Sequence, residues 1–236
     1  MSNTLTIAGR QFRSYFNGAV AYIVLCLVML ALGFWFWKTF FLFNKATARE
    51  MFDTLRGILA FAVPALTMGL LAEEKRTGTV ELLITMPVRE AEVIVGKFLG
   101  VLGLFGVLLA LTLPYPMSVA ALGPIDWGPV FTGYFGLLLQ GGAMMAIGLM
   151  TSSFTENQLI AFFGALAITV PLAFMHMLLP LFPTAATSVL EWFSFHYHFD
   201  SMARGVLDLR NVLYFTSLTI FCLMVAFRSL ESRRWS

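Results

Sequence analysis

The segment AEEKRTGTVELLITMP, residues 72–87, is a short charged stretch that separates two long apolar runs. No charged residue occurs over 57–72 before it or over 98–125 after it. Each run is near or above the roughly 17–20 residues that an α-helix needs to cross a hydrocarbon core of about 30 Å. The segment therefore predicts a pair of membrane-spanning helices joined by a polar connection at one membrane surface.

The connection itself has the features of a short helix. Gly78 and Thr79 suit a helix start, and Glu81 is favourable in the first turn because it lies near the positive end of the helix dipole. Pro87 disfavours the helical conformation of the residue before it, so we predict a helix over 78–86. This helix is either a docking element for a partner protein or a simple connector, and the residues alone leave both interpretations open.

Hydrophobic residues make up 59% of the 236 residues and charged residues only 12%, whereas a soluble domain carries roughly 25% charged residues. Further charge-free runs of membrane-spanning length follow one another along the chain. We therefore predict an all-α polytopic membrane protein that forms a single domain over 1–236. Its six transmembrane helices are expected at 18–40, 56–73, 91–121, 128–152, 157–182 and 210–228.

Polar residues mark the ends of two of these helices. Arg56 adjoins the short run 57–72, and we expect its side chain to snorkel to the lipid headgroups at little cost. Thr155 and Gln158 have the spacing of a capping box, which predicts that this pair opens the fifth span.

The segment before the first span predicts an N-terminal interfacial helix over 3–16, with apolar residues on one side and Arg10 and Arg13 on another. A frayed tail is the alternative. The two arginines are expected at the same membrane surface as Glu73 and Glu74, where the second span ends. We predict that at least one Arg–Glu ion pair forms there, most readily with Glu74, and braces the connection 72–87.

Between the fifth and sixth spans, residues 183–209 are rich in bulky apolar and aromatic side chains. They predict a short outer helical hairpin that dips partway into the membrane, which requires that protein or water satisfies its backbone. The majority of the 15 Lys and Arg residues lie on the side of the N-terminus if the chain crosses six times. This bias favours a cytoplasmic location of both termini.

No phosphate-binding loop of the form G-x-x-x-x-G-K-[ST] occurs in the sequence, so the chain is not expected to hydrolyse ATP or to be an enzyme. His196 and His198 form a His-x-His pair without an evident third ligand, and interfacial packing is the favoured interpretation. His176 is an intramembrane histidine and hence a functional candidate. Cys26 and Cys222 lie in apolar runs, so no disulfide is predicted. A net charge of +2 without a basic stripe argues against nucleic acid.

Several motifs resemble the ABC-2 type permease family. EEKRTGTVELLITMPV (73–88) and VGK (95–97) are similar to the first cytoplasmic loop and coupling helix of that family. FHYHFDSMARGVLDLRNVLYF (195–215), LESRRW (230–235) and TSSFTENQ (151–158) resemble its gliding-motility-associated branch.

This resemblance implies the membrane-spanning permease subunit of a bacterial ABC transporter in the inner membrane. The chain itself would hold no cofactor or metal and no catalytic residue, because ATP and Mg²⁺ would bind to a separate ABC ATPase subunit present in two copies. Further implied partners are a second permease copy or a related membrane subunit, the lipid bilayer, and a membrane protein with a large extracytoplasmic domain. The substrate, and the choice between export and force transmission, stay open.

Three groups of site residues follow. The expected ATPase contacts in the coupling helix are Thr79, Glu81, Leu82, Leu83 and Thr85. A second cytoplasmic contact is expected at Thr155, Glu156 and Asn157. The residues expected to brace the loop are Glu73, Glu74, Arg10 and Arg13. Two alternatives remain at this point: an ion-coupled secondary carrier or channel, and a membrane scaffold that transports nothing. No Asp, Glu, Lys or Arg lies in the middle of a predicted span, which argues against the carrier.

Overall fold

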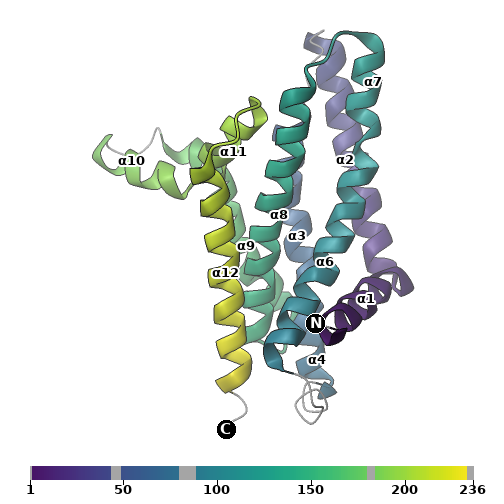
Figure 1. The fold of residues 1–236 in the computed structure, drawn as a ribbon, viewed down its shortest axis with the longest axis vertical. Helices are drawn as coiled ribbons and strands as arrows, with labels where there is room; N and C mark the ends of the chain where they lie inside the picture. The colour runs from purple at the N-terminus through teal and green to yellow at the C-terminus, as the bar shows by residue number, and fades with distance from the viewer. Residues whose placement is uncertain (1, 44–48, 80–88, 180–183, 233–236) are drawn as a thin grey trace.

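The computed structural model describes residues 2–43, 49–79, 89–179 and 184–232, which form helices and contain no strand. Most helices pack side by side along one direction, while α10 projects sideways from the bundle (Figure 1). The helices are α1 (Ser2–Asn17), α2 (Ala19–Phe43), α3 (Arg49–Thr67), α4 (Gly69–Arg76), α6 (Glu90–Thr112), α7 (Pro114–Leu122), α8 (Trp127–Phe154), α9 (Gln158–Leu178), α10 (Thr184–Phe193), α11 (Phe195–Ala203) and α12 (Leu209–Ser232).

Six segments of the described chain are long and apolar enough to cross a membrane. Four of them lie within the single helices α2, α8, α9 and α12. The other two each contain two helices in sequence, α3 with α4 over Arg49–Arg76 and α6 with α7 over Glu90–Leu122. The prediction of an all-α membrane protein with six spans is therefore confirmed. Helix α1 begins and α12 ends at the same end of the bundle (Figure 1).

Two predictions about helix ends are wrong. The second span begins at Arg49 rather than at 56, because Arg56 is only 7% exposed and binds Asp53 of the same helix and His196 of α11 instead of reaching headgroups. The fifth span is not opened by a capping box of Thr155 and Gln158. Asn157 is the N-cap of α9, and its side-chain oxygen accepts a hydrogen bond from the backbone N–H of Leu159 at 2.9 Å. Asparagine is among the best N-cap residues because its oxygen satisfies a free N–H of the first turn.

The second span is interrupted between Thr67 and Gly69, and other helices take up the polar groups around this break. Pro64 has no N–H to bond the carbonyl of Ala60, and the hydroxyl of Thr169 on α9 donates to that carbonyl at 3.3 Å. The hydroxyl of Tyr15 on α1 donates to the carbonyl of Leu66 at 2.8 Å. Side chains of α1 and α9 therefore hydrogen-bond to the backbone of the second span near this interruption.

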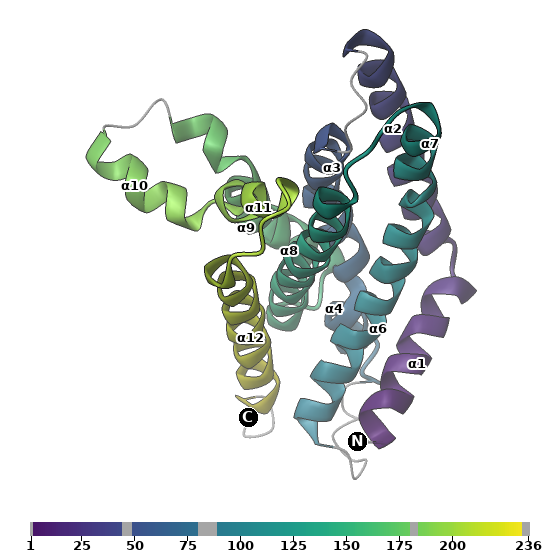
Figure 2. The same ribbon diagram turned by 45° about the horizontal axis from the view of Figure 1, so that its top comes forward.

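Helix α1 packs directly against α6, and the two run alongside each other in Figure 2. Glycines on one side of α6 make this possible. A Cβ at Gly96 would lie 2.8 Å from the Cβ of Ile7, and one at Gly100 would lie 2.7 Å from the Cβ of Gln11. Such separations lie inside van der Waals contact, so α1 can lie this close only because α6 has no side chains there.

We expect the change Gly100→Leu to displace α1 from α6, because the new side chain would need the space of Gln11 and the backbone of Ala8. Overpacking of this kind costs typically about 1–3 kcal/mol or more. The change Gly106→Leu, on the same helix, is the control because nothing lies within 4 Å of a Cβ there. Cysteine cross-linking between α1 and α6 measures the displacement. Equal cross-linking in both variants would contradict the expectation.

Helix α8 lies at the centre of the described helices and contacts α3, α6, α9, α11 and α12. Its glycines admit large side chains from its neighbours. A Cβ at Gly133 would lie 2.5 Å from the ring of Phe52 on α3, and Gly141 lies against the ring of Phe105 on α6. The central helix thus fixes the rotation of α3 and α6, which carry the polar residues described below.

Candidate functional site

The end of the bundle at which α1 begins also holds the end of α4 and the turn between α8 and α9 (Figure 1). Thr79, the residue of the predicted coupling-helix contacts that the structure describes, is helical and exposed. The remaining predicted contacts of this helix lie outside the described residues: Glu81, Leu82, Leu83 and Thr85.

A left-handed residue separates α4 from the helical residue Thr79. Gly78 has φ +70°, which residues with a side chain rarely adopt, and its N–H donates to the carbonyl of Lys75 at 3.2 Å. The hydroxyl of Thr77 donates to the carbonyl of Glu73 at 2.9 Å. The hydroxyl of Thr79 donates to the carbonyl of Glu74 at 3.2 Å. The end of α4 is therefore held by several hydrogen bonds. Gly78 lies in the turn between this end and Thr79, where the predicted coupling helix starts.

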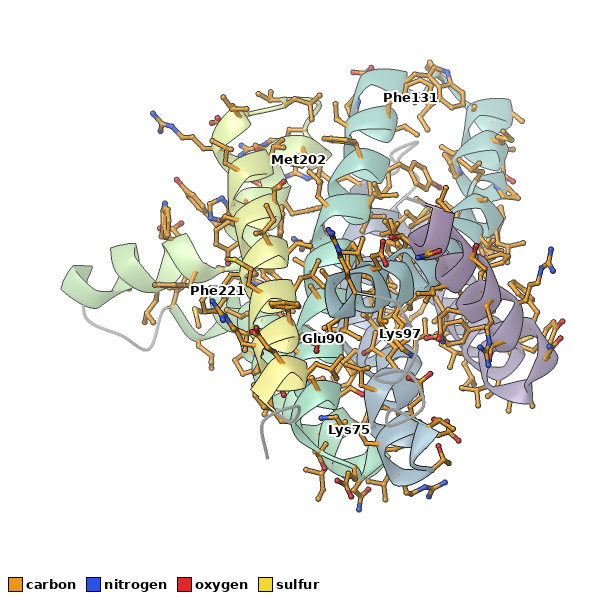
Figure 3. The ribbon with its side chains drawn as sticks, turned by 60° about the horizontal axis from the view of Figure 1, so that its bottom comes forward. Lys75, Glu90, Lys97, Phe131, Met202 and Phe221 are labelled. Carbon is orange, nitrogen blue, oxygen red and sulfur yellow. The ribbon has the colours of Figure 1, made fainter. Side chains whose placement is uncertain are left out.

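Lys97 on α6 joins three helices through a buried ammonium group. Its Nζ lies 2.7 Å from Oε1 of Glu74 and donates to the carbonyl of Leu70 at 2.7 Å, both on α4. A third bond reaches Oε1 of Gln11 on α1 at 3.4 Å. Lys97 is only 3% exposed, and it lies among the helices in the view that brings this end forward (Figure 3). A buried lysine of this kind fixes the position of α4 relative to α1 and α6.

Two serines at the end of α8 bind the other side of α4. The hydroxyl of Ser152 accepts hydrogen bonds from the N–H groups of Leu71 and Ala72, both at 3.0 Å. The buried Nζ of Lys75, labelled in Figure 3, donates to the carbonyl of Ser153. The hydroxyl of Ser229 on α12 donates to the same carbonyl at 2.9 Å. Helix α4 is thereby fixed to α8, and α12 meets the same point.

The predicted ion pair between the N-terminal arginines and Glu73 or Glu74 does not form in the described structure. Glu74 pairs with Lys97 instead, and Glu73 is exposed. Arg10 and Arg13 are exposed and line an open hollow of about 680 Å³. They lie on the side of α1 opposite to the residues that contact α6, because helix periodicity separates positions 10 and 13 from that side.

The second predicted contact, Thr155–Asn157, forms the turn between α8 and α9 at the same end. Glu156 and Asn157 are exposed, and the hydroxyl of Thr155 accepts from the N–H of Asn157 at 3.1 Å. The side chain of Gln158 lies near Gly69 and hence near the start of α4. The structure thus brings this turn and α4 together, although they are far apart in sequence.

A second cluster lies at the other end of the membrane-spanning region, around Arg56 on α3. Its Nη2 donates to Oδ1 of Asp53 and to Nδ1 of His196 on α11, both at 2.7 Å. Its guanidinium carbon lies 4.8 Å from the ring centre of Phe199, a cation–π distance. In the sequence, Arg56 lies at the end of the charge-free run 57–72, and no partner within the protein was predicted for it. The acidic residue three positions earlier was the local signal that this arginine can be paired within the protein.

The three histidines have different surroundings. His176 on α9 stacks on His196 with ring centres 4.1 Å apart. Burial, then the charge of Arg56 and the neighbouring His176, lower the pKa of His196 to about 4. His198 faces away: its Nε2–H donates to the carbonyl of Trp192 at 2.8 Å, and its ring stacks on Tyr214 at 3.9 Å. His198 therefore fixes α10 and α11 to α12.

Within the described residues, no three His, Cys, Asp or Glu side chains come close enough together to hold a metal ion. Cys26 and Cys222 are both unbonded thiols. The arrangement of the described polar residues is thus suited to two tasks. One is rigid connection at the end of α4, and the other is the binding of polar groups near Arg56.

Comparison with protein families matches residues 40–228 to a family model. The matching family is described as ABC-2 family transporter protein. The match spans most of the chain and includes α4, the α8–α9 turn and the Arg56 cluster. A comparison with curated proteins finds no match.

Proposed function

Because the chain belongs to the ABC-2 family of transporter proteins, and is thus a multi-pass membrane permease component of an ABC transporter, we propose that it couples ATP hydrolysis in a separate ATPase subunit to movement of its own spans. Two ATPase copies would act on a pair of permease chains in the bacterial inner membrane, with both termini in the cytoplasm. The work done is export or the transmission of force to an outer partner.

One observation carries this proposal: α4, which leads into the predicted coupling helix, is bound rigidly by helices on several sides. Lys97 attaches it to α6 and α1, while Ser152 and Lys75 attach it to α8. A displacement applied beyond Thr79 would therefore be passed to several spans at once. A simple surface connector has no need of such attachments, because flexible linkers between spans are tolerated.

The α8–α9 turn supports the same proposal. It exposes Glu156 and Asn157 beside α4, together with the apolar side chain of Phe154, which is 59% exposed. A partner that grips the coupling helix would meet this turn as well. The turn proposed as the second ATPase contact thus lies beside the end of α4, from which the chain continues into the predicted coupling segment.

Reconstitution tests the proposal. The chain is purified together with the Walker-type ATPase encoded nearest to it, inserted into liposomes, and assayed for ATP hydrolysis with and without the chain. We expect a stable complex and an increase in hydrolysis when the chain is present. Transport or ion flux that needs an ion gradient and no nucleotide would support the carrier or channel instead. A complex in which nucleotide changes neither hydrolysis nor the accessibility of the spans would support the scaffold.

The finer assignment to the gliding-motility-associated branch is part of the proposal and rests on the motifs of residues 195–215 and 230–235. It predicts a further membrane partner with a large extracytoplasmic domain. Cross-linking from the outer side, followed by mass spectrometry of the products, checks this. Capture of no such protein from the native membrane would remove the finer assignment and leave the ABC-2 function in place.

A further inference from the structure

Two of the buried polar atoms that lack a hydrogen-bond partner in the described structure belong to residues around a single cavity. They are Nη1 of Arg56 and Oε1 of Gln140, and His176 lines the same cavity. Buried polar groups are nearly always hydrogen-bonded, and an unpaired one costs about 1–3 kcal/mol, with more for a charged group. Two such groups on one cavity, one of them charged, indicate that something polar binds there.

The cavity has a volume of about 300 Å³ and lies between α3, α8, α9 and α11. Its volume is at the lower end of the range of about 300–1,000 Å³ that is typical of small-molecule sites. His176 and His196 also line a larger cavity of about 530 Å³ formed by α9, α10, α11 and α12. The stacked histidine pair thus stands between an inner cavity and an outer one.

Arg56 determines which hydrogen-bonding groups the inner cavity presents. A guanidinium can only donate, so the Nδ1 of His196 that lies 2.7 Å from it accepts. The proton of neutral His196 is therefore on Nε2, which makes this nitrogen a donor. The Nη2 of Arg56 is occupied by Asp53 and His196, whereas its Nη1 is buried and free.

Asp53 also lines the cavity and pairs with Arg56 at 2.7 Å. The side chain of Asp53 is 46% exposed, so solvent screens much of its charge. Gln140 is 2% exposed, and its amide can turn to present either oxygen or nitrogen. Of the two charged residues that line the cavity, Arg56 is the buried one, at 7% exposure.

We propose that this cavity is a binding site for an oxyanion, a phosphate or carboxylate group whose oxygens accept from Nη1 of Arg56. Guanidinium groups match the geometry of these anions and bind them strongly where water is excluded. Gln140 and His176 then bind the polar atoms next to the anion. The anion can come from a lipid headgroup or from a free solute. The proposal goes beyond the coupling function, because it concerns binding by the membrane chain without an ATPase.

Thermal unfolding of the purified full chain in a neutral detergent tests this site with three probes. They are inorganic phosphate, dihexanoyl phosphatidic acid and dihexanoylglycerol, the last of which lacks the phosphate. Ligands that bind the folded state raise the unfolding temperature in a saturable way. We expect this rise with phosphatidic acid, and not with dihexanoylglycerol. A rise with phosphate as well supports a free oxyanion as a sufficient ligand, while a rise with phosphatidic acid alone supports a lipid headgroup.

Substitutions connect the effect to the cavity. The change Arg56→Gln should weaken the apparent affinity at least tenfold. The change Arg210→Gln, which removes an exposed charge outside the inner cavity, should leave the affinity unchanged. The change Ala173→Leu narrows the cavity, keeps every charge and should also abolish binding, so it decides the matter if Arg56→Gln does not fold. No rise with either phosphate probe, or binding that persists in Ala173→Leu, would overturn the site.

Discussion

Replacing Leu83 with glutamate is expected to abolish the stimulation of a partner ATPase while the membrane domain stays folded. The expected apolar side of the coupling helix consists of Val80, Leu83 and Ile84, which lie outside the described residues. A carboxylate in an apolar contact would lose its hydration without gaining a partner. Central contacts of an interface are worth about 2 kcal/mol or more, and a loss of that size corresponds to roughly 30-fold weaker binding.

ATP hydrolysis by the reconstituted complex measures this effect, and circular dichroism of the detergent-solubilised chain checks the fold. The matched control is Val206→Glu, which adds the same group at an exposed site at the opposite end of the bundle. The control should stimulate hydrolysis normally. Normal stimulation by a folded Leu83→Glu variant would show that this helix does not contact the ATPase.

Replacing Lys97 with methionine is expected to lower the free energy of unfolding by about 3–5 kcal/mol, the usual cost of removing one member of a buried ion pair. The partner Glu74 would keep its charge without a cation. Its second oxygen, Oε2, is already buried without a hydrogen bond in the described structure. The loss would also free the carbonyl of Leu70 and the side chain of Gln11.

Unfolding by denaturant in detergent measures this prediction. The double change Lys97→Met with Glu74→Leu should recover most of the lost stability, because no uncompensated charge then remains. Arg228→Met is the matched control. Its pair with Glu231 at 3.0 Å is exposed, with side-chain exposures of 79% and 38%, and such pairs contribute only about 0–1 kcal/mol. Similar losses in both single variants would show that burial does not strengthen the Lys97 pair.

The two clusters of polar residues differ in what they do for the molecule. At the first cluster, Lys97 on α6 forms an ion pair with Glu74 on α4, which suits a rigid connection between these two helices. Around Arg56 a guanidinium group remains partly free beside a cavity, which suits a ligand. Both cations are buried near the ends of apolar runs, so burial does not distinguish them. They differ in their partners: the ammonium group of Lys97 has three, whereas Nη1 of Arg56 has none in the described structure.

The sequence by itself determined the class of fold and the number of spans. Hydropathy is a sum over neighbouring residues, and the cost of placing charge in lipid acts on each segment separately. For this reason the charge-free runs identified six spans without any knowledge of their packing. The same local information located the expected coupling segment after Glu74, since Gly78 and Pro87 act on the backbone beside them.

Only the tertiary structure decided which charges meet. Arg10 and Glu74 are at the same end of the molecule, but Glu74 binds Lys97, because glycines on α6 set the depth and rotation at which α1 packs. Arg56 likewise meets His196 far along the chain. Such pairs depend on helix rotation, which many distant packing contacts fix together. Each apolar run tolerates several rotations in lipid, so its sequence alone cannot select one.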